Sequence, residues 1–254
     1  MTTGPAAAGA VTTGADRPET VHVWLIRQDL PPPVLAELAA ALDTSERARA
    51  ARAERVGADH GRRFAAAHGA ARLILGRHLR IAAHQVRWRT GPNGKPELAD
   101  ADAGVHVSLS HSGDLAALAI LDARRVGIDV QVFPTRSHAI RVAERFFPAA
   151  EARFVVDAAP AAQARRFTRL WARKEACVKV TGGRLFQGLR LPVGATGRAV
   201  VHDPWGPLPG PYLVQDVPGP RRFGIAVAAE GTAPYRVLRH WWPDAGFTSA
   251  QTGS

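Results

Sequence analysis

The chain has 254 residues, of which 46% are hydrophobic, and it carries a formal net charge of +11. This length suffices for one large domain or for two small lobes, and no apolar run is long enough to cross a bilayer. The single cysteine, Cys177, excludes an internal disulfide, and we expect it to be a small packing residue in a cytoplasmic protein. The positive charge predicts an acidic partner: a nucleic acid, an anionic membrane, an acidic protein or a phosphorylated ligand.

The first part of the chain is predicted to contain a polar tail, helices and two short strands. Residues 1–20 are small and polar, which predicts a disordered tail and not a signal peptide. The hydrophobic and turn patterns then predict a strand, three helices and a second strand, over residues 21–26, 34–43, 44 onward, 61–80 and 86–88. Residues 91–96, Gly-Pro-Asn-Gly-Lys-Pro, predict a rigid turn that displays Lys95.

The early helices are rich in arginine, which suits contacts to phosphate. Within the long helix, Arg63 and Arg72 are expected to project towards an anion. For Arg47, Arg49 and Arg52 the sequence does not distinguish a phosphate contact from an ordinary solvated helix face.

Three strands are predicted in the middle of the chain. Residues 105–110 alternate in polarity and run into a loop at 111–114, and residues 115–121 are a continuous apolar run. Residues 126–130 follow a turn, and we expect them to form a hairpin with 115–121. Asp129 interrupts this apolar strand, so if buried it needs a partner, which a cation would supply.

The last part of the chain mixes helices with short strands. Helices are expected over 137–147, 149–156 and 161–180, and strands over 189–191, 199–201, 212–214, 224–228 and 235–241. Helices and mainly antiparallel strands in both halves indicate an α+β fold. Residues 244–254 predict a flexible tail.

Glu175 and Lys179 lie four residues apart in the predicted helix 161–180, which the pair Gly182-Gly183 is expected to end. Its buried stripe is predicted to contain Phe167, Leu170, Trp171 and Val178. By itself, a Glu followed by a Lys at this spacing is typical of a surface ion pair that contributes about 0.2–0.5 kcal/mol. A functional interpretation therefore depends on the rest of the chain.

Four short motifs occur in a fixed order: Gly94-Lys95-Pro96, Ser108-Leu109-Ser110-His111-Ser112, Gly127-Ile128-Asp129, and Trp171 with Lys174, Glu175 and Lys179. Each is weak alone. Together they resemble the 4′-phosphopantetheinyl transferase superfamily, in its larger surfactin-synthetase-activator type. The resemblance covers about residues 21–240. It implies two similar α/β lobes fused in one chain, 21–124 and 125–243, with the active site at their interface.

The resemblance also implies an activity. The 4′-phosphopantetheine arm of coenzyme A would pass to a serine of an apo acyl or peptidyl carrier protein, with release of adenosine 3′,5′-bisphosphate, in a Mg²⁺-dependent reaction. Asp129 and Glu175 match the family's metal carboxylates. Glu175 would also accept the serine proton, directly or through a water, and Lys179 would stabilise charge at the pyrophosphate or protonate the leaving group.

The coenzyme contacts follow from the same resemblance. His111 matches the histidine that contacts the 3′-phosphate of coenzyme A, with Ser110 beside it, and Lys95 matches the lysine of the Gly-Lys-Pro turn. Arg63 is a further candidate phosphate contact.

The chain departs from the family pattern at two positions. Gln131 stands where a third carboxylate is often found; its amide offers an oxygen without charge, so it is a candidate ligand that would hold magnesium more weakly. His68 stands where Arg is frequent, which puts one phosphate contact in doubt.

Two other classes of function compete with the enzyme. A basic nucleic-acid-binding protein would explain the charge, although the signatures of the common modules are missing. A non-catalytic carrier-protein-binding homologue is hinted at by Gln131 alone. The expected partners are coenzyme A and a carrier protein, with no nucleic acid and no membrane, and the family type implies a monomer. The carrier and its pathway stay open.

Overall fold

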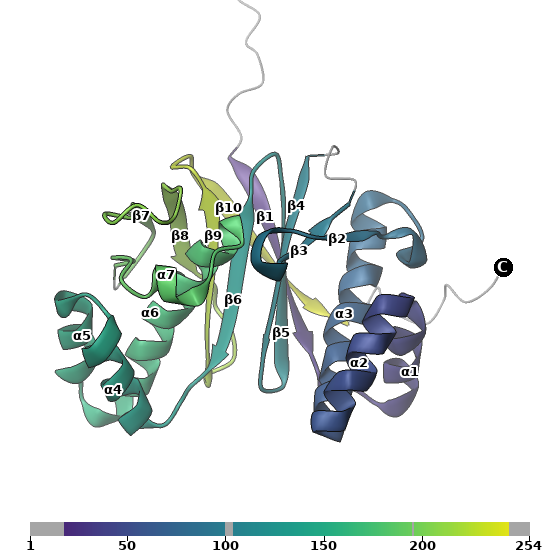
Figure 1. Ribbon diagram of the computed structural model, residues 1–254, viewed down its shortest axis with the longest axis horizontal. Coiled ribbons are helices and arrows are strands. Elements are labelled where there is room, and N and C mark those ends of the chain that lie inside the picture. The colour runs from purple at the N-terminus through teal and green to yellow at the C-terminus, as the bar shows by residue number, and fades with distance from the viewer. Residues whose placement is uncertain (1–17, 100–103, 195, 244–254) are drawn as a thin grey trace, which may run out of the picture.

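Two four-stranded sheets lie side by side in the computed structural model, with helices on their outer sides (Figure 1). The structure describes residues 18–99, 104–194 and 196–243. The expected tails therefore lie outside the described residues, apart from 18–20, of which Glu19 and Thr20 already belong to the first strand.

The first sheet has the strand order β10-β1-β5-β4. Its strands are β1 (Glu19–Arg27), β4 (Val105–Ser112), β5 (Leu115–Asp122) and β10 (Tyr235–Trp242). The associated helices are α1 (Pro32–Ala41), α2 (Thr44–Val56) and α3 (Ala58–Leu79), followed by the short 3₁₀ turns Ala83–Gln85 and Pro92–Gly94 and the ribbon of β2 (Trp88–Thr90) and β3 (Pro96–Leu98).

The second sheet has the strand order β6-β9-β8-β7. Its strands are β6 (Val126–Val132), β7 (Ala199–Val201), β8 (Tyr212–Asp216) and β9 (Phe223–Glu230). The helices are α4 (Arg136–Phe146), α5 (Ala149–Val156), α6 (Pro160–Thr181) and the short α7 (Leu185–Gly188).

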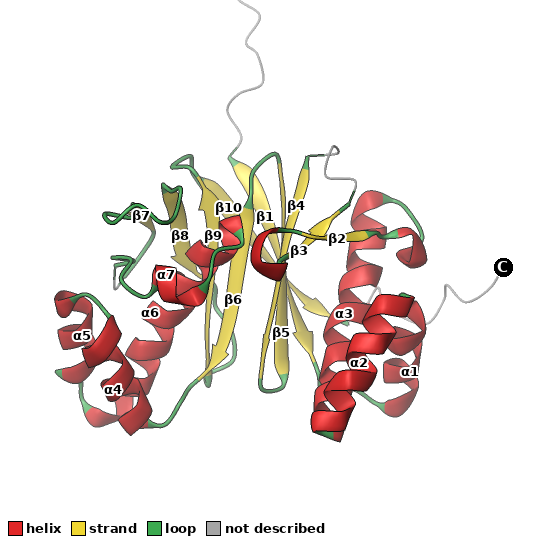
Figure 2. Ribbon diagram, in the orientation of Figure 1, coloured by secondary structure: helices red, strands yellow, loops and turns green. Residues whose placement is uncertain are grey.

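The sheets pack face to face because the strands alternate their apolar side chains. On β5, Leu115, Ala117 and Ala119 contact the second sheet, whereas Leu118 and Ile120 contact the layer of α1 and α3. A third apolar cluster lies between the second sheet and α4, α5 and α6. The layers are thus helix, sheet, sheet, helix, which Figure 2 shows by element type, and the α+β prediction is confirmed.

Two predicted strand arrangements are wrong. The expected hairpin of 115–121 with 126–130 does not exist: β5 already has β1 and β4 on its two edges, so β6 pairs with β9 in the other sheet. The hairpin is instead β4–β5, whose turn contains Gly113 at φ 61°. Residues 189–191 are not a strand, because they leave α7 in a turn in which the Leu191 N–H bonds the Gly188 carbonyl.

The chain passes from the first sheet to the second between β5 and β6, in the turn that contains the expected lobe boundary. The final strand β10 then returns and pairs in parallel with β1, so the first sheet is built from both ends of the described chain. None of the helices in the described ranges is long and apolar enough to span a membrane.

Candidate active site

Helix α6 crosses β6 at very short range because Gly127 has no side chain. A Cβ placed on Gly127 would lie 2.0 Å from the carbonyl oxygen of Ala176 and 2.7 Å from the backbone nitrogen of Val180. This close approach brings the last turns of α6 beside Asp129, two residues along the strand. The helix ends at Gly182 in the left-handed conformation, with φ 70°, as the sequence predicted.

Asp129 is buried, and its partner is a cation, as expected. Its Oδ1 accepts hydrogen bonds from Lys179 Nζ at 2.7 Å and Ser110 Oγ at 2.8 Å, and Lys179 Nζ also donates to Ser110 Oγ at 2.8 Å. Burial raises the pKa of Asp129, although Lys179 and Ser110 oppose the shift. Lys179 is thus bound to Asp129 on β6, and Asp129 Oδ2 is buried with no hydrogen-bond partner within the described residues.

Glu175 lies half-buried at a cavity of about 220 Å³, which is also lined by Lys95, Ser108 and Lys179. Burial raises the pKa of Glu175 to about 7, and the charge of Asp129 adds to the shift, while Lys179 opposes it. Glu175 and Lys179 therefore line this cavity, and Asp129 lies beside it, bound to the Lys179 ammonium.

The oxygen donors at this point fit a hard cation in part. No group of three or more His, Cys, Asp or Glu side chains in the described part of the chain is arranged to hold a metal. Gln131 follows Asp129 at a spacing of two, hence on the same face of β6, but its amide nitrogen donates to the Val132 carbonyl at 3.2 Å. Because Mg²⁺ keeps several waters and commonly takes only one or two protein carboxylates, Asp129 and Glu175 with the unpartnered Oδ2 are a sufficient set.

Lys95 lies at the same cavity, where its ammonium binds backbone. Its Nζ donates to the carbonyls of Val126 at 3.1 Å and Val180 at 3.0 Å, so it joins the turn 91–96 to β6 and to the end of α6. Burial lowers the pKa of Lys95 to about 8. The turn is tied down again by Asn93, whose Nδ2 donates to the Gly182 carbonyl at 2.7 Å.

His111 lies at the surface in a strongly positive environment. Desolvation of the ring lowers its pKa, and the nearby groups of His68, Lys179, Arg63 and His60 lower it further. Such a gathering of donors and positive charge favours an anion. The basic groups around His111 therefore support a contact to a phosphate, but they do not identify which phosphate.

Arg63 lies away from the first cavity, although its charge acts on His111. It lines a second cavity of about 190 Å³ together with Gln28, Arg62 and Asp114, and its guanidinium lies 3.9 Å from Asp59. Lys95, Glu175 and Lys179 therefore line the first cavity, Lys179 binds Asp129 and Ser110 beside it, and Arg63 lines a separate cavity.

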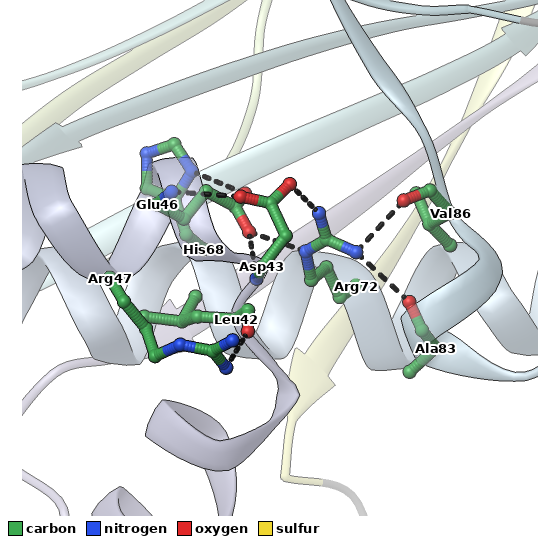
Figure 3. A network of polar contacts seen from close by, with 8 residues as sticks. All are labelled: Leu42, Asp43, Glu46, Arg47, His68, Arg72, Ala83 and Val86. Carbon is green, nitrogen blue, oxygen red and sulfur yellow. Dashed lines mark hydrogen bonds and ion pairs between the residues drawn. The ribbon is translucent and has the colours of Figure 1, made fainter.

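The prediction that Arg72 projects towards an anion is wrong. Arg72 is 1% exposed, and its guanidinium binds Glu46, Asp43 and the carbonyls of Ala83 and Val86 (Figure 3). It is the core of a polar network that ties α3 to the start of α2 and to the segment after α3. Its guanidinium is buried and bound to groups of the protein itself, so it does not project towards a ligand.

Other polar side chains of this region also have structural partners. His68 is buried, with Nδ1 3.4 Å from Glu46 Oε1 and its ring stacked on Phe64 at 4.0 Å between centroids. Arg47 donates to the Leu42 carbonyl, and Arg49 lies over the Phe64 ring at 5.1 Å. Arg52 is exposed.

Sequence reasoning missed what Lys174, the residue before Glu175, does. Lys174 is fully buried, and its Nζ bonds Glu151 Oε2 of α5 at 2.5 Å. Trp171 is partly buried against Phe167, in agreement with a packing role, and Cys177 is fully buried, with a pKa that burial raises to about 12. These three residues fix α6 on its inner side. A charged residue in a buried helix stripe is the signal that should have prompted a search for a partner.

Part of the chain is similar to known proteins. A model of the 4′-phosphopantetheinyl transferase superfamily matches residues 125–206, which include β6 and α6. The 4′-phosphopantetheinyl transferase HetI of Nostoc sp. is 37% identical over 166 residues, which are 65% of this chain and 69% of that protein. A putative 4′-phosphopantetheinyl transferase of Synechocystis sp. is 30% identical over 66% of this chain and 67% of its own length. Sfp of Bacillus subtilis, also named a 4′-phosphopantetheinyl transferase, is 30% identical over 48% of this chain and 51% of its own length.

These matches agree with a two-sheet α+β fold whose polar residues converge where β6 meets α6. The chain belongs to the 4′-phosphopantetheinyl transferase superfamily. The prediction that it is an enzyme of this class is confirmed.

Proposed function

We propose that the protein transfers the 4′-phosphopantetheine arm of coenzyme A to a serine of an apo acyl or peptidyl carrier protein and releases adenosine 3′,5′-bisphosphate. The observation that carries the proposal is that Lys95, Glu175 and Lys179 line one cavity, while the Lys179 ammonium is hydrogen-bonded to Asp129 and Ser110. In this reaction the serine oxygen bonds to phosphorus, and the bond from that phosphorus to the adenosine 3′,5′-bisphosphate oxygen breaks.

Glu175 is the proposed base. Its pKa of about 7 in the metal-free protein places it where a carboxylate can accept a proton near neutral pH. Lys179 is the proposed counter-charge: its ammonium already bonds Asp129 and Ser110, so it is held in place to stabilise charge on the leaving phosphate or to protonate it.

Asp129 and Glu175 are the proposed magnesium ligands, with Gln131 as a neutral third candidate. The ion would neutralise pyrophosphate charge and polarise the reacting phosphorus. Support comes from the unpartnered buried Oδ2 of Asp129 and from the raised pKa values of both carboxyl groups, which burial shifts towards the protonated form and which a bound cation would lower.

Magnesium binding can be measured without turnover. We expect Mg²⁺ to raise the melting temperature of the protein at pH 8 and to raise it much less at pH 5.5, because protonation of Glu175 competes with the ion. Asp129→Asn should abolish the shift. An equal shift in Asp129→Asn and in the unmodified protein would remove Asp129 from the metal site.

Ser110, His111, Lys95 and Arg63 are the proposed coenzyme contacts. His111 carries most weight, because four other basic groups act on it. Lys95 retains one donor beyond its two carbonyl partners, so it can serve both the fold and an anion. Arg63 would reach only a part of the coenzyme that extends to the second cavity.

We further propose that the chain acts as a cytoplasmic monomer of two lobes, 21–124 and 125–243, with β10 exchanged into the first sheet. Its proposed partners are coenzyme A and a carrier protein, with neither nucleic acid nor membrane. The net charge of +11 supports an acidic carrier surface as the docking partner.

The proposal is tested by incubating the protein with coenzyme A, Mg²⁺ and each of several apo carrier proteins, and then measuring the intact mass of the carrier. We expect a gain of one phosphopantetheine arm on at least one carrier, and none when coenzyme A is omitted. No gain on any carrier, together with binding of a carrier, would identify a non-catalytic carrier-binding protein instead.

A further inference from the structure

The two sheets, which pack face to face, also come together at one pair of edge strands that share no backbone ladder. Strand β4 is at the edge of the first sheet and β6 is at the edge of the second, and the two strands pack against each other. An edge strand presents an unpaired N–H and C=O at every second residue. A buried N–H left without a partner costs about 1–3 kcal/mol. The N–H groups on the free edge of β6 therefore need acceptors that are not backbone carbonyls of a neighbouring strand.

Serine side chains of β4 supply these acceptors at every second residue. Ser108 Oγ accepts the Ile128 N–H at 3.1 Å, Ser110 Oγ accepts the Val130 N–H at 3.3 Å, and Ser112 Oγ accepts the Val132 N–H at 3.1 Å. The period of two along β4 matches the period of two along β6. We call these three contacts the serine ladder.

Lys95 continues the same edge at its other end. Within a strand, the N–H and C=O of one residue point to the same side, and the Val126 carbonyl that Lys95 binds belongs to the same alternating set as the ladder amides. The edge of β6 is thus bound by side chains from Val126 to Val132. This arrangement leaves the serine hydroxyl protons free to donate, and Ser110 uses its proton on Asp129.

The serine ladder fixes the position of one part of the site relative to another. His111 lies between Ser110 and Ser112 on β4, whereas Asp129 lies between the ladder amides of Val130 and Ile128 on β6. A change in the distance between β4 and β6 would therefore change the distance between His111 and Asp129. Misplacement by about 1 Å at a reacting centre can cost up to about 100-fold in rate.

We propose that Ser108 and Ser112 are positioning residues, which hold β4 at a fixed register and distance from β6 so that the coenzyme contacts of one sheet and the carboxylates of the other face one ligand. This rests on the proposed function for the identity of the ligand. The ladder itself rests on the three hydrogen bonds alone. Neither Ser108 nor Ser112 touches the reacting groups in this account.

Ser112 allows a matched test, because it is only partly buried. Ser112→Val removes the hydroxyl, and Ser112→Thr keeps it in a side chain of the same shape. In nuclear magnetic resonance, the Val132 amide should exchange with solvent about tenfold faster in Ser112→Val, the effect of one lost hydrogen bond, and at the normal rate in Ser112→Thr. Equal exchange in all three proteins would overturn the ladder.

The positioning role is measured by calorimetric binding of coenzyme A. We expect Ser112→Val to bind coenzyme A about tenfold more weakly, which corresponds to the loss of one hydrogen bond. Ser112→Thr should bind coenzyme A with normal affinity. Thr135→Ala is the control for general destabilisation, because it removes the N-cap of α4, which accepts the His138 N–H and lies outside the ladder, and it should bind normally. Equal affinity of Ser112→Val and the unmodified protein would refute the positioning role.

The same experiment separates the two proposals. Failure of the unmodified protein to bind coenzyme A would refute the proposed function and, with it, the positioning role, while amide exchange would still decide whether the ladder exists. Faster exchange of Val132 with unchanged coenzyme A affinity would leave the ladder as a purely structural joint.

Discussion

The packing of α6 on β6 makes Gly127→Ala the most informative single substitution for the fold. The new Cβ would lie 2.0 Å from the Ala176 oxygen, whereas real Cβ contacts are essentially never under 3.0 Å, so helix and strand must separate by about 1 Å. The atoms it meets are backbone atoms of a helix that is buried on this side, and they cannot rotate away.

Overpacking of this kind costs about 1–3 kcal/mol and occasionally more. Because all three atoms nearest to the new Cβ are backbone, we expect a loss of at least about 3 kcal/mol in the free energy of unfolding. The displacement also moves Glu175 and Lys179 away from Asp129, so the transfer rate of the folded fraction should fall by up to about 100-fold.

Urea unfolding followed by tryptophan fluorescence measures the stability change. The matched control is Gly57→Ala, whose Cβ would meet only the exposed ring of His60, at 2.8 Å, and that ring can rotate aside. The control should lie within about 0.5 kcal/mol of the unmodified protein. If Gly127→Ala were as stable as Gly57→Ala, the close packing of α6 on β6 and the geometry derived from it would be wrong.

Three further predictions follow from other parts of the structure. Arg72→Met should lower the free energy of unfolding by about 3–5 kcal/mol, because it leaves the buried carboxylate of Glu46 without its cation; exposed Arg52→Met is the control, and a loss under about 1 kcal/mol would contradict the network. Burial, His240 and His78 lower the pKa of His22, so the unfolded chain binds the proton first as the pH falls below 6.5, and stability should decrease there. In urea titrations at several pH values, His22→Asn should reduce the dependence of the free energy of unfolding on pH by up to one proton. An unchanged dependence on pH would refute this role of His22. Gln131→Glu should leave magnesium use unchanged or tighter in metal titrations of the transfer rate, whereas a large loss would show that the amide has a role of its own.

Helices were the most predictable elements, because their signals are local. The range expected for the helix 161–180 agrees with α6 to within one residue at each end, since Pro160 and Gly182 mark its limits within a few residues of chain. Asp129 was likewise understood from its strand alone: a carboxylate in an apolar run needs a cation, and Lys179 is that cation.

Strand partners could not be predicted because they depend on distant residues. The run 115–121 was long and apolar enough to be an interior strand, and its two neighbours, β1 and β4, left no edge for β6. The parallel pairing of β10 with β1 joins residues more than 200 positions apart, and no local pattern carries it.

The candidate site could be predicted only in part, because the sequence does not show in which direction a helical side chain points. Arg63 and Arg72 lie in the same helix, and the sequence predicted the same role for both. Arg72 is nevertheless buried in the core, whereas Arg63 lines a cavity. The difference comes from distant partners: Asp43, the N-cap of α2, and Glu46 in its first turn bind the guanidinium of Arg72 (Figure 3). The serine ladder did have a sequence signal, serines at every second position, but the strand that it faces was assigned to the wrong partner.

The most direct test of the account is the transfer rate of Glu175→Gln at saturating coenzyme A, measured by the intact mass of an apo carrier protein with time. Loss of the base should slow transfer by about 100-fold or more, while calorimetric affinity for coenzyme A stays within the normal range. Glu37→Gln, an exposed carboxylate on α1, is the control and should transfer normally. Normal turnover in Glu175→Gln would contradict the proposed role of the carboxylate that faces Asp129 and Lys179.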